Sequence, residues 1–266
     1  DSRLLRTPLL HDKVMFYLNK LTYPVPDSII SSVDDVMELA SQDDDMYKYW
    51  TIWLTSHYER SKVMGMDEVF VHLAEKYYLS ERADWLTPNS RKKMEERIRK
   101  LKPNFVGNTA PNLIMKSIDG KVHNLHNVEA DYTILYFWDS GCGHCKKVTP
   151  LLKKLYGKVK DYDVEVYAVN IEVESKEYKK YIEDRDLDWI NVQDTLNITN
   201  FRNLYDIYST PVIYLLDKDK KILAKRISTQ QLEDILARQT DIPNLEEMDE
   251  EEKKKLEEEK ENEEAD

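Results

Sequence analysis

One stretch decides the fold of this chain: Ile134-Leu135-Tyr136-Phe137-Trp138-Asp139-Ser140-Gly141-Cys142-Gly143-His144-Cys145. It opens as a run of apolar, strand-forming residues and ends in two cysteines that are separated by two residues. No other cysteine occurs among the 266 residues, so a small scaffold held together by several disulfides is excluded. The pair must therefore carry chemistry or bind a metal.

The position of the two cysteines favours redox chemistry. The pattern predicts a helix from Cys142 to about Tyr156, directly after the strand. Unpaired N–H groups and a partial positive charge at a helix N-terminus favour a thiolate there, so we expect Cys142 to be the nucleophile. Cys145 lies one turn further on the same face and can resolve a mixed disulfide. A donor or positive charge on His144 would stabilise the thiolate and make the disulfide a stronger oxidant.

The sequence around this stretch predicts an α/β domain. The step Lys102-Pro103-Asn104 indicates a domain boundary. Beyond it, strand-like runs alternate with helical patterns, which is typical of a mixed sheet with helices on both faces. We expect strands at 112–115, 122–125, 133–138, 164–170, 212–216 and 222–226, helices at 142–156, 175–185 and 229–238, and an irregular stretch before residue 212.

Residues 1–104 read as an all-helical domain, because their apolar residues recur at helical spacing. We expect five helices: one through Leu9 to Leu21, one capped by Asp27, one through Met46 to Tyr58 that Gly65 ends, one from Asp67, and one from Pro88. The third helix carries an aromatic stripe, for which a core role is favoured over a docking face: Tyr47, Trp50, Trp53 and Tyr58. Three histidines within these patterns are expected to pack or lie at the surface: His11, His57 and His72.

Charge is concentrated at the C-terminal end. The formal net charge is −12, and residues 246–266 alone hold 13 Asp or Glu and 4 Lys. The rest of the chain, residues 1–245, is nearly neutral. Nucleic-acid binding is therefore not expected, because it needs clustered Lys and Arg. No apolar run is long enough to span a bilayer. We expect residues 241–266 to form an acidic tail that is helical or disordered.

The stretch that ends in Cys145 resembles the thioredoxin superfamily, and the resemblance covers about residues 105–240. Pro150 matches the kinking proline of the family's active-site helix. Thr210-Pro211 matches its cis-proline loop, which lies against the cysteine pair and offers backbone groups to an extended substrate. The segment Ala110-Pro111-Asn112-Leu113 resembles the entry of the TlpA/ResA-type branch.

The resemblance implies a thioredoxin-like fold and a thiol-disulfide oxidoreductase. Its partners would be protein thiols or disulfides and an upstream electron donor or acceptor, and it would need no cofactor beyond its own Cys142–Cys145 disulfide. Substrate contact would fall to Thr210, Pro211 and Trp138. The helical region resembles a domain of unknown function that precedes thioredoxin domains in Bacteroidetes envelope proteins. Periplasm or cell envelope is therefore the expected location, although the chain opens at Asp1 without a signal peptide.

The chain departs from the family at the positions that handle protons. Tyr136 stands where thioredoxins hold a buried acid, and Ala168 stands near its lysine neighbour. Val148 replaces the glutamate that the TlpA/ResA-type branch places three residues after the second cysteine. Asp139, water or the Tyr136 hydroxyl could accept the proton of Cys145, and the sequence does not rank them. Gly141 replaces an aromatic residue and leaves the approach to Cys142 more open.

Three other interpretations compete with redox exchange. A zinc site would need His123 and His126 to complete the cysteine pair, and their spacing is unconvincing. A peroxidase would place a threonine three residues before the reactive cysteine, where this chain has Asp139. A redox-inactive platform would use the fold, the helices and the acidic tail for recognition, and the missing proton acceptors are its best support.

Overall fold

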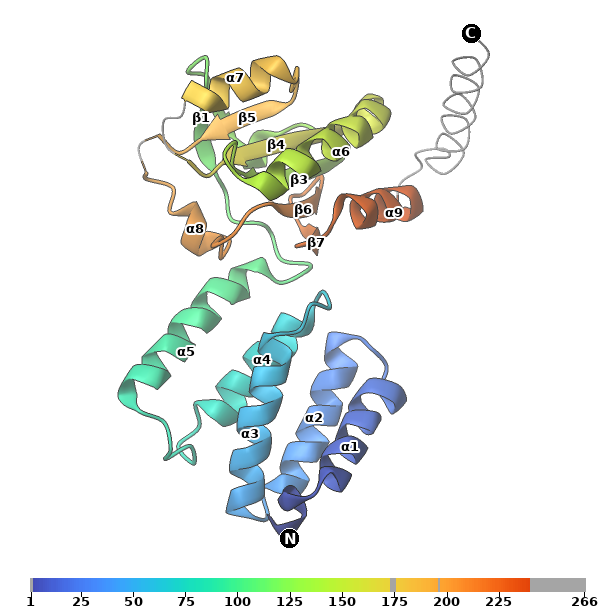
Figure 1. Cartoon of the computed structure of the whole chain (residues 1–266), viewed down its shortest axis with the longest axis vertical. Helices are drawn as coiled ribbons and strands as arrows, with labels where there is room; N and C mark the ends of the chain where they lie inside the picture. Colours follow the sequence, from blue (N-terminus) through green and yellow to red (C-terminus); the bar gives the residue numbers. More distant parts are fainter. Residues whose placement is uncertain (1, 173–175, 196, 240–266) are drawn as a thin grey trace. The chain divides into compact units, whose positions relative to one another are not determined.

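A computed structural model describes residues 2–172, 176–195 and 197–239 (Figure 1). The chain divides into a helical unit, which comprises Asp1–Pro111 and Asn203–Asp206, and a sheet unit, which comprises Asn112–Arg202 and Ile207 onwards. The helical unit thus continues past the predicted division at residue 104. The predicted acidic tail lies outside the described residues. Within the described ranges, no helix combines the length and apolar character that crossing a membrane requires.

The sheet unit is built on one mixed sheet with the strand order β2-β1-β5-β4-β3-β6-β7. Strands β3, β4 and β5 run parallel, while β1, β2, β6 and β7 pair antiparallel to their neighbours. The strands are β1 Ile114–Ser117, β2 Val122–Asn124, β3 Tyr132–Trp138, β4 Val164–Asn170, β5 Ile190–Gln193, β6 Val212–Asp217 and β7 Ile222–Lys225. Its helices are α6 Gly143–Val159, α7 Lys176–Asp184 and α9 Thr229–Gln239. The short helix α8 Phe201–Leu204 begins in this unit, and its last two residues are counted with the helical unit.

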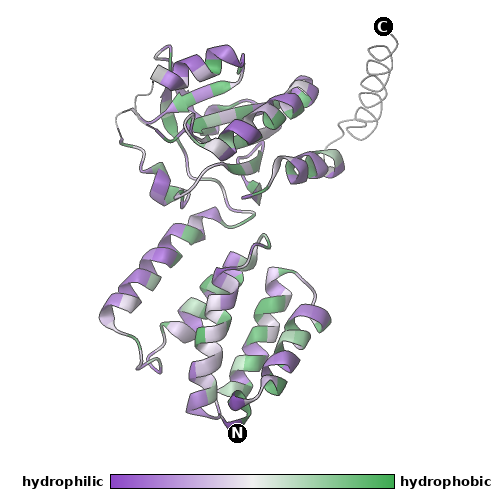
Figure 2. Ribbon diagram, viewed as in Figure 1, coloured by the Kyte–Doolittle hydropathy of each residue, from purple (hydrophilic) through white to green (hydrophobic). Residues whose placement is uncertain are grey.

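Helices cover both faces of this sheet, and the side chains of β3 are therefore buried on each side. Alternate side chains of β3 share one core with residues of α6, α7 and α9: Ile134, Tyr136 and Trp138. On the opposite face Phe137 stacks against Phe201 of α8, with ring centroids 6.0 Å apart. Figure 2 shows the hydrophobic residues concentrated along the strands and the hydrophilic ones along the outer sides of the helices. The predicted mixed sheet is confirmed.

Two elements were absent from the sequence prediction, which left the chain irregular before residue 212. Strand β5 and helix α8 both lie there, and each has only four residues. Polar residues at alternate positions of β5 weaken its apolar signal. The strand forms because β4 pairs with it in parallel and β1 pairs with it antiparallel, and these partners are distant in sequence.

The helical unit contains five α-helices among its described residues: α1 Pro8–Phe16, α2 Pro26–Ala40, α3 Asp44–Glu59, α4 Met66–Leu73 and α5 Pro88–Leu101. Short 3₁₀ or π-helical turns flank them at Ser2–Arg6, Tyr17–Leu21, Ala74–Tyr78 and Lys102–Asn104. Their apolar sides form one core that includes Val33, Met37, Leu54, Val69, Phe70 and Leu73. The predicted all-helical character is confirmed.

Two helix ends differ from the prediction. Asp27 was expected to cap the second helix, but α2 begins at Pro26 and Val25 is its N-cap. Proline suits the first helical turn because its missing N–H needs no partner there. Gly65 was expected to end the third helix, but α3 ends at Glu59 and Gly65 precedes α4 with a φ of 86°. A left-handed backbone of this kind favours glycine.

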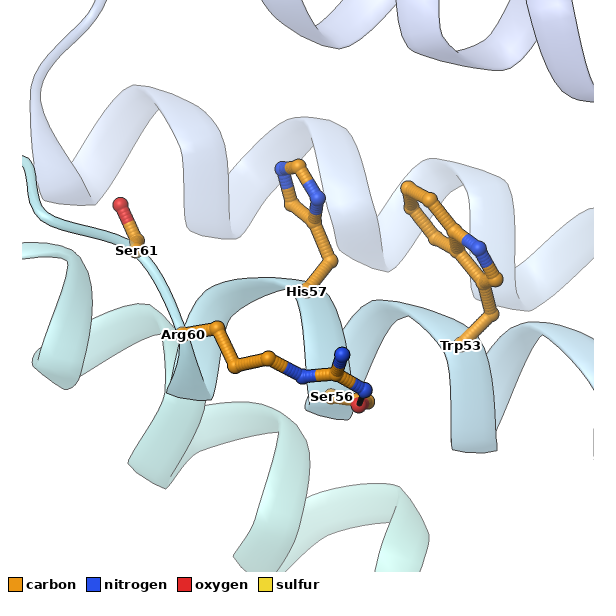
Figure 3. A pocket seen from close by; sticks show the side chains of 5 residues that line it. All are labelled: Trp53, Ser56, His57, Arg60 and Ser61. Carbon is orange, nitrogen blue, oxygen red and sulfur yellow. Dashed lines mark hydrogen bonds between the residues drawn. The ribbon is translucent and has the colours of Figure 1, made fainter.

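The aromatic stripe of α3 divides between core and surface. Tyr47, Trp50 and Tyr58 are buried, as the core interpretation predicts. Trp53 is only half-buried, and its ring stacks on His57 with centroids 4.8 Å apart. Figure 3 shows these two rings side by side on α3, where they line a shallow pocket with Ser56, Arg60 and Ser61.

Candidate functional site

The candidate site begins where β3 ends and α6 starts. Cys142 is the N-cap of α6, which has 17 residues, and its carbonyl accepts the backbone N–H of Lys146 at 3.1 Å. A tight turn precedes it, in which the Cys142 N–H donates to the Asp139 carbonyl at 3.2 Å. The local sequence therefore places one sulfur at the positive end of a long helix, where a thiolate is stabilised.

The two thiols lie in different environments. Cys142 is half-buried, whereas Cys145 is 0 % exposed. Burial alone would raise the pKa of Cys142, but hydrogen bonds from Cys145, Thr210 and the backbone outweigh it and hold the pKa below its ordinary value. Burial raises the pKa of Cys145 to about 12. One thiol is thus poised to ionise and the other to stay protonated.

The structure brings three predicted site residues together. Thr210 and Pro211 are joined by a cis peptide bond. The Cys142 Sγ donates to the Thr210 carbonyl at 3.6 Å, so this loop lies against the reactive thiol. Such an arrangement leaves backbone groups beside the sulfur that an extended peptide could pair with.

Two further predicted residues lie on α6. His144 is exposed in its first turn, and its backbone contributes to the lowered pKa of Cys142. Pro150 lies inside the same helix and is also exposed. A proline there removes one backbone hydrogen bond, so its place in the helix is consistent with a kink rather than with a chemical role.

Trp138 does not lie where a substrate could reach it. Its side chain is 0 % exposed, and its ring stacks on Tyr136 with an interplanar angle of 4°. Tyr178 and Tyr181 of α7 pack against its other parts. The expected substrate contact is therefore wrong for this structure, because the indole fills the core beneath the cysteine pair.

Glu172 is a site residue that the sequence reasoning missed. A methyl group added to Gly141 would lie 3.2 Å from Asp139 Oδ1 and 3.9 Å from Glu172 Oε1, so both carboxyls lie beside the residue that precedes Cys142. Burial, then repulsion from Asp139 and Glu177, raises the pKa of Glu172. One signal could have found it: Glu172 follows β4 as Asp139 follows β3, and the ends of parallel neighbours meet at one sheet edge.

The histidines considered for a metal site lie apart from the cysteines in the structure. His123 lies on β2, where its Nε2 is 3.2 Å from Ser117 Oγ, and His126 lies in the short turn that follows. In the part of the chain that the structure describes, no cluster of three or more His, Cys, Asp or Glu side chains could hold a metal ion.

A known oxidoreductase is similar in sequence to about half of this chain. Thiol-disulfide oxidoreductase ResA of a Bacillus cereus strain is 30% identical over 130 residues, which is 49% of this chain and 74% of that protein. The chain belongs to the ResA-type thiol-disulfide oxidoreductases. A second comparison covers the same part of the chain: residues 106–225 match the AhpC/TSA family.

Further comparisons concern the helical unit and the fold of this ResA-type protein. Residues 1–104 match a family described as a domain of unknown function, DUF5106. A thioredoxin-like protein from Bacteroides caccae ATCC 43185 has 20% identity and a TM-score of 0.68, over 90% of this chain and 87% of that chain, which supports the fold. A domain of a possible thiol-disulfide isomerase from Cytophaga hutchinsonii ATCC 33406 has 46% identity and a TM-score of 0.49, over 51% of this chain and 93% of that chain.

Proposed function

We propose that this ResA-type oxidoreductase exchanges electrons with protein dithiols and disulfides through Cys142 and Cys145. The observation that carries the proposal is the contrast between the two sulfurs. One caps a helix, is half-buried and has a lowered pKa, while the other is fully buried with a pKa of about 12. An exposed thiolate attacks, and a thiol shielded from solvent is reserved for the second step.

The exchange takes two steps. The Cys142 thiolate attacks one sulfur of a substrate disulfide, a bond forms between them, and the other substrate sulfur leaves as a thiolate. Cys145 then loses its proton and attacks Cys142 Sγ, which forms the Cys142–Cys145 disulfide and releases the second substrate sulfur. The substrate gains two electrons and the enzyme loses two, so a donor of two electrons must reduce the enzyme again. The same steps run in reverse to oxidise a dithiol.

The neighbouring residues assist without any further cofactor. The Thr210–Pro211 loop holds an extended substrate segment through its backbone groups, since it already contacts the reactive sulfur. His144 is exposed beside Cys142, where it stabilises the thiolate and makes the Cys142–Cys145 disulfide a stronger oxidant. In this proposal the enzyme's own Cys142–Cys145 disulfide carries the electrons.

We place this activity in the cell envelope or periplasm. The support is the relationship to ResA, since ResA proteins are envelope-associated thiol-disulfide oxidoreductases. Disulfide exchange with folded proteins belongs in compartments where disulfides persist.

Substrate trapping tests the proposal. Cys145→Ala removes the second step, so it should retain its target as a mixed disulfide that a reductant releases, while Cys142→Ser should retain none. Insulin reduction gives an independent measure: the wild-type rate should exceed that of Cys142→Ser by at least about 100-fold. Equal, negligible insulin rates together with no trapped disulfide would favour the binding platform.

A further inference from the structure

The first helical segment of the helical unit exposes many large apolar side chains. Within residues 4–25, six of them are between 38% and 72% exposed: Leu4, Leu9, Phe16, Leu21, Tyr23 and Val25. Scattered single apolar side chains are ordinary on a protein surface, whereas a group of this size marks a site of interaction with a protein or a membrane. Figure 1 shows α1 at the edge of the helical unit, where such a partner can reach it.

Helical spacing brings part of this group onto one side of the segment. Leu9, Lys13 and Phe16 are four and three residues apart along α1, so their side chains are neighbours on the helix surface. Lys20 and Leu21 lie about one turn further, because a π-helical turn continues the helix after Phe16. All five side chains are exposed. We call these five residues the basic-apolar stripe.

The other side of the same segment is already covered. Leu10, Val14 and Tyr17 pack against the core of the helical unit, and Leu18 is only 1% exposed. A helix that needs to bury one side alone carries polar residues on the other. This segment instead has leucine and phenylalanine on its outer side as well, and packing within the helical unit does not account for them.

The charge of the segment indicates the chemistry of its partner. Residues 1–25 contain four Lys or Arg and two Asp, although the whole chain has a net charge of −12. The four basic side chains are exposed: Arg3, Arg6, Lys13 and Lys20. A second copy of this chain would bring like charges together, which is unfavourable. An anionic surface is complementary to these charges.

We propose that this segment binds the surface of a membrane that contains anionic lipids, with α1 lying in the plane of the membrane. Leu9, Phe16 and Leu21 enter the boundary between headgroups and acyl chains, as the apolar side of an interfacial helix does. The long stems of Lys13 and Lys20 lie along this apolar surface while their ammonium groups reach the lipid phosphates. The contact would hold the helical unit at the membrane, and it is independent of the thiol exchange.

Vesicle binding tests the proposal with the full chain. Vesicles of equal parts phosphatidylglycerol and phosphatidylcholine should sediment the protein, and phosphatidylcholine alone should bind it at least about 10-fold more weakly. Raising the salt from about 0.1 M to about 1 M should also weaken binding, because it screens exposed charges. The double variant Leu9→Ser with Phe16→Ser should bind at least about 10-fold more weakly, and so should Lys13→Gln with Lys20→Gln.

Matched controls change exposed residues of the sheet unit. Ile198→Ser alters a side chain that is 73% exposed, and Lys218→Gln removes an exposed charge between β6 and β7. Both should bind vesicles as the wild type does. Insulin reduction should keep its wild-type rate in every variant, which separates this proposal from the exchange function.

Three results would overturn membrane binding by this segment. The first is a wild-type protein that does not bind the anionic vesicles, and the second is unchanged binding in both double variants. The third is a dimer that Phe16→Ser dissociates, without any vesicle binding, which would assign the stripe to a second copy. If a double variant fails to fold, the single variant Phe16→Ser decides, because its side chain is 57% exposed.

Discussion

Two ionisable groups, one in each unit of this protein, are held in opposite ways. In the helical unit Asp34 accepts three short hydrogen bonds, from His72 and Tyr77 at 2.7 Å and from Lys76 at 2.8 Å. In the sheet unit the Cys142 sulfur lies 3.6 Å from the Thr210 carbonyl, which is a longer contact than any of these three. A carboxylate with three short hydrogen bonds contributes to stability, whereas a half-buried sulfur with a longer contact stays available for reaction.

This contrast explains why the sheet unit carries the chemistry. Burial would raise the pKa of Asp34, but its partners on α4 and the turn that follows outweigh burial and lower it. Those bonds join α2 to neighbouring elements, so they contribute to packing. At Cys142 the lowered pKa comes from hydrogen bonds with Cys145, Thr210 and the backbone, and the residue is only half-buried. The helical unit is therefore expected to influence stability rather than the reaction rate.

The largest expected effect concerns the thiols. In the reduced protein at pH 7, Cys142 should react with iodoacetamide at least about 1,000-fold faster than Cys145, because a thiol of pKa about 12 is ionised to only about one part in 10⁵. Mass spectrometry of proteolytic peptides after timed labelling measures both rates, and Cys142→Ser shows Cys145 alone. Equal rates at mildly acidic pH would remove the contrast on which the exchange mechanism depends.

A core substitution in the helical unit tests its independence. Leu54→Ala removes a side chain that is 0 % exposed, and it should lower the free energy of unfolding by about 2–5 kcal/mol. Ile52→Ala on the same helix changes a side chain that is 40% exposed, and it should cost below about 1 kcal/mol. Urea unfolding measures both. The rate of Cys142 alkylation should stay at its wild-type value while the protein is folded, and slower labelling in Leu54→Ala would show that the units are coupled.

The smallest effect is a pH dependence at Asp34. Because the folded pKa lies below the ordinary value of 3.8, the ionised carboxylate stabilises the folded state above that pH, and this contribution is lost as the pH falls through the lowered pKa. Asp34→Asn should cost about 1–2 kcal/mol near neutrality and less below pH 4, as judged by unfolding at several pH values. Glu38→Gln, an exposed neighbour on α2, should show no such trend. A cost for Asp34→Asn that is equal at all pH values would contradict the role of the charge.

Much of the site was predictable because it is local. A strand, a tight turn and a helix start occupy adjacent residues, so the positions of Cys142 and Cys145 on α6 follow from the order of residues alone. The strands β3, β4, β6 and β7 were also predicted within a residue or two, since each has a strong apolar run bounded by turns. The cis Thr210–Pro211 bond was expected from the family resemblance rather than from local physics.

The misses share a different cause. Trp138 was assigned to the substrate surface, but residues of α7 bury it. Strand β5 was absent from the prediction because its signal is short and its partners are distant.

The amino-acid order alone thus determined which sulfur begins a helix, since helix polarity acts within a single turn of the chain. It also determined the fold class, because strand-like and helical patterns alternate in the sequence itself. Only the tertiary structure decided how deeply each side chain is buried and which acids meet beside Gly141. Burial and the meeting of Asp139 with Glu172 depend on the pairing of β3 with β4, and such pairing joins residues that are far apart in sequence.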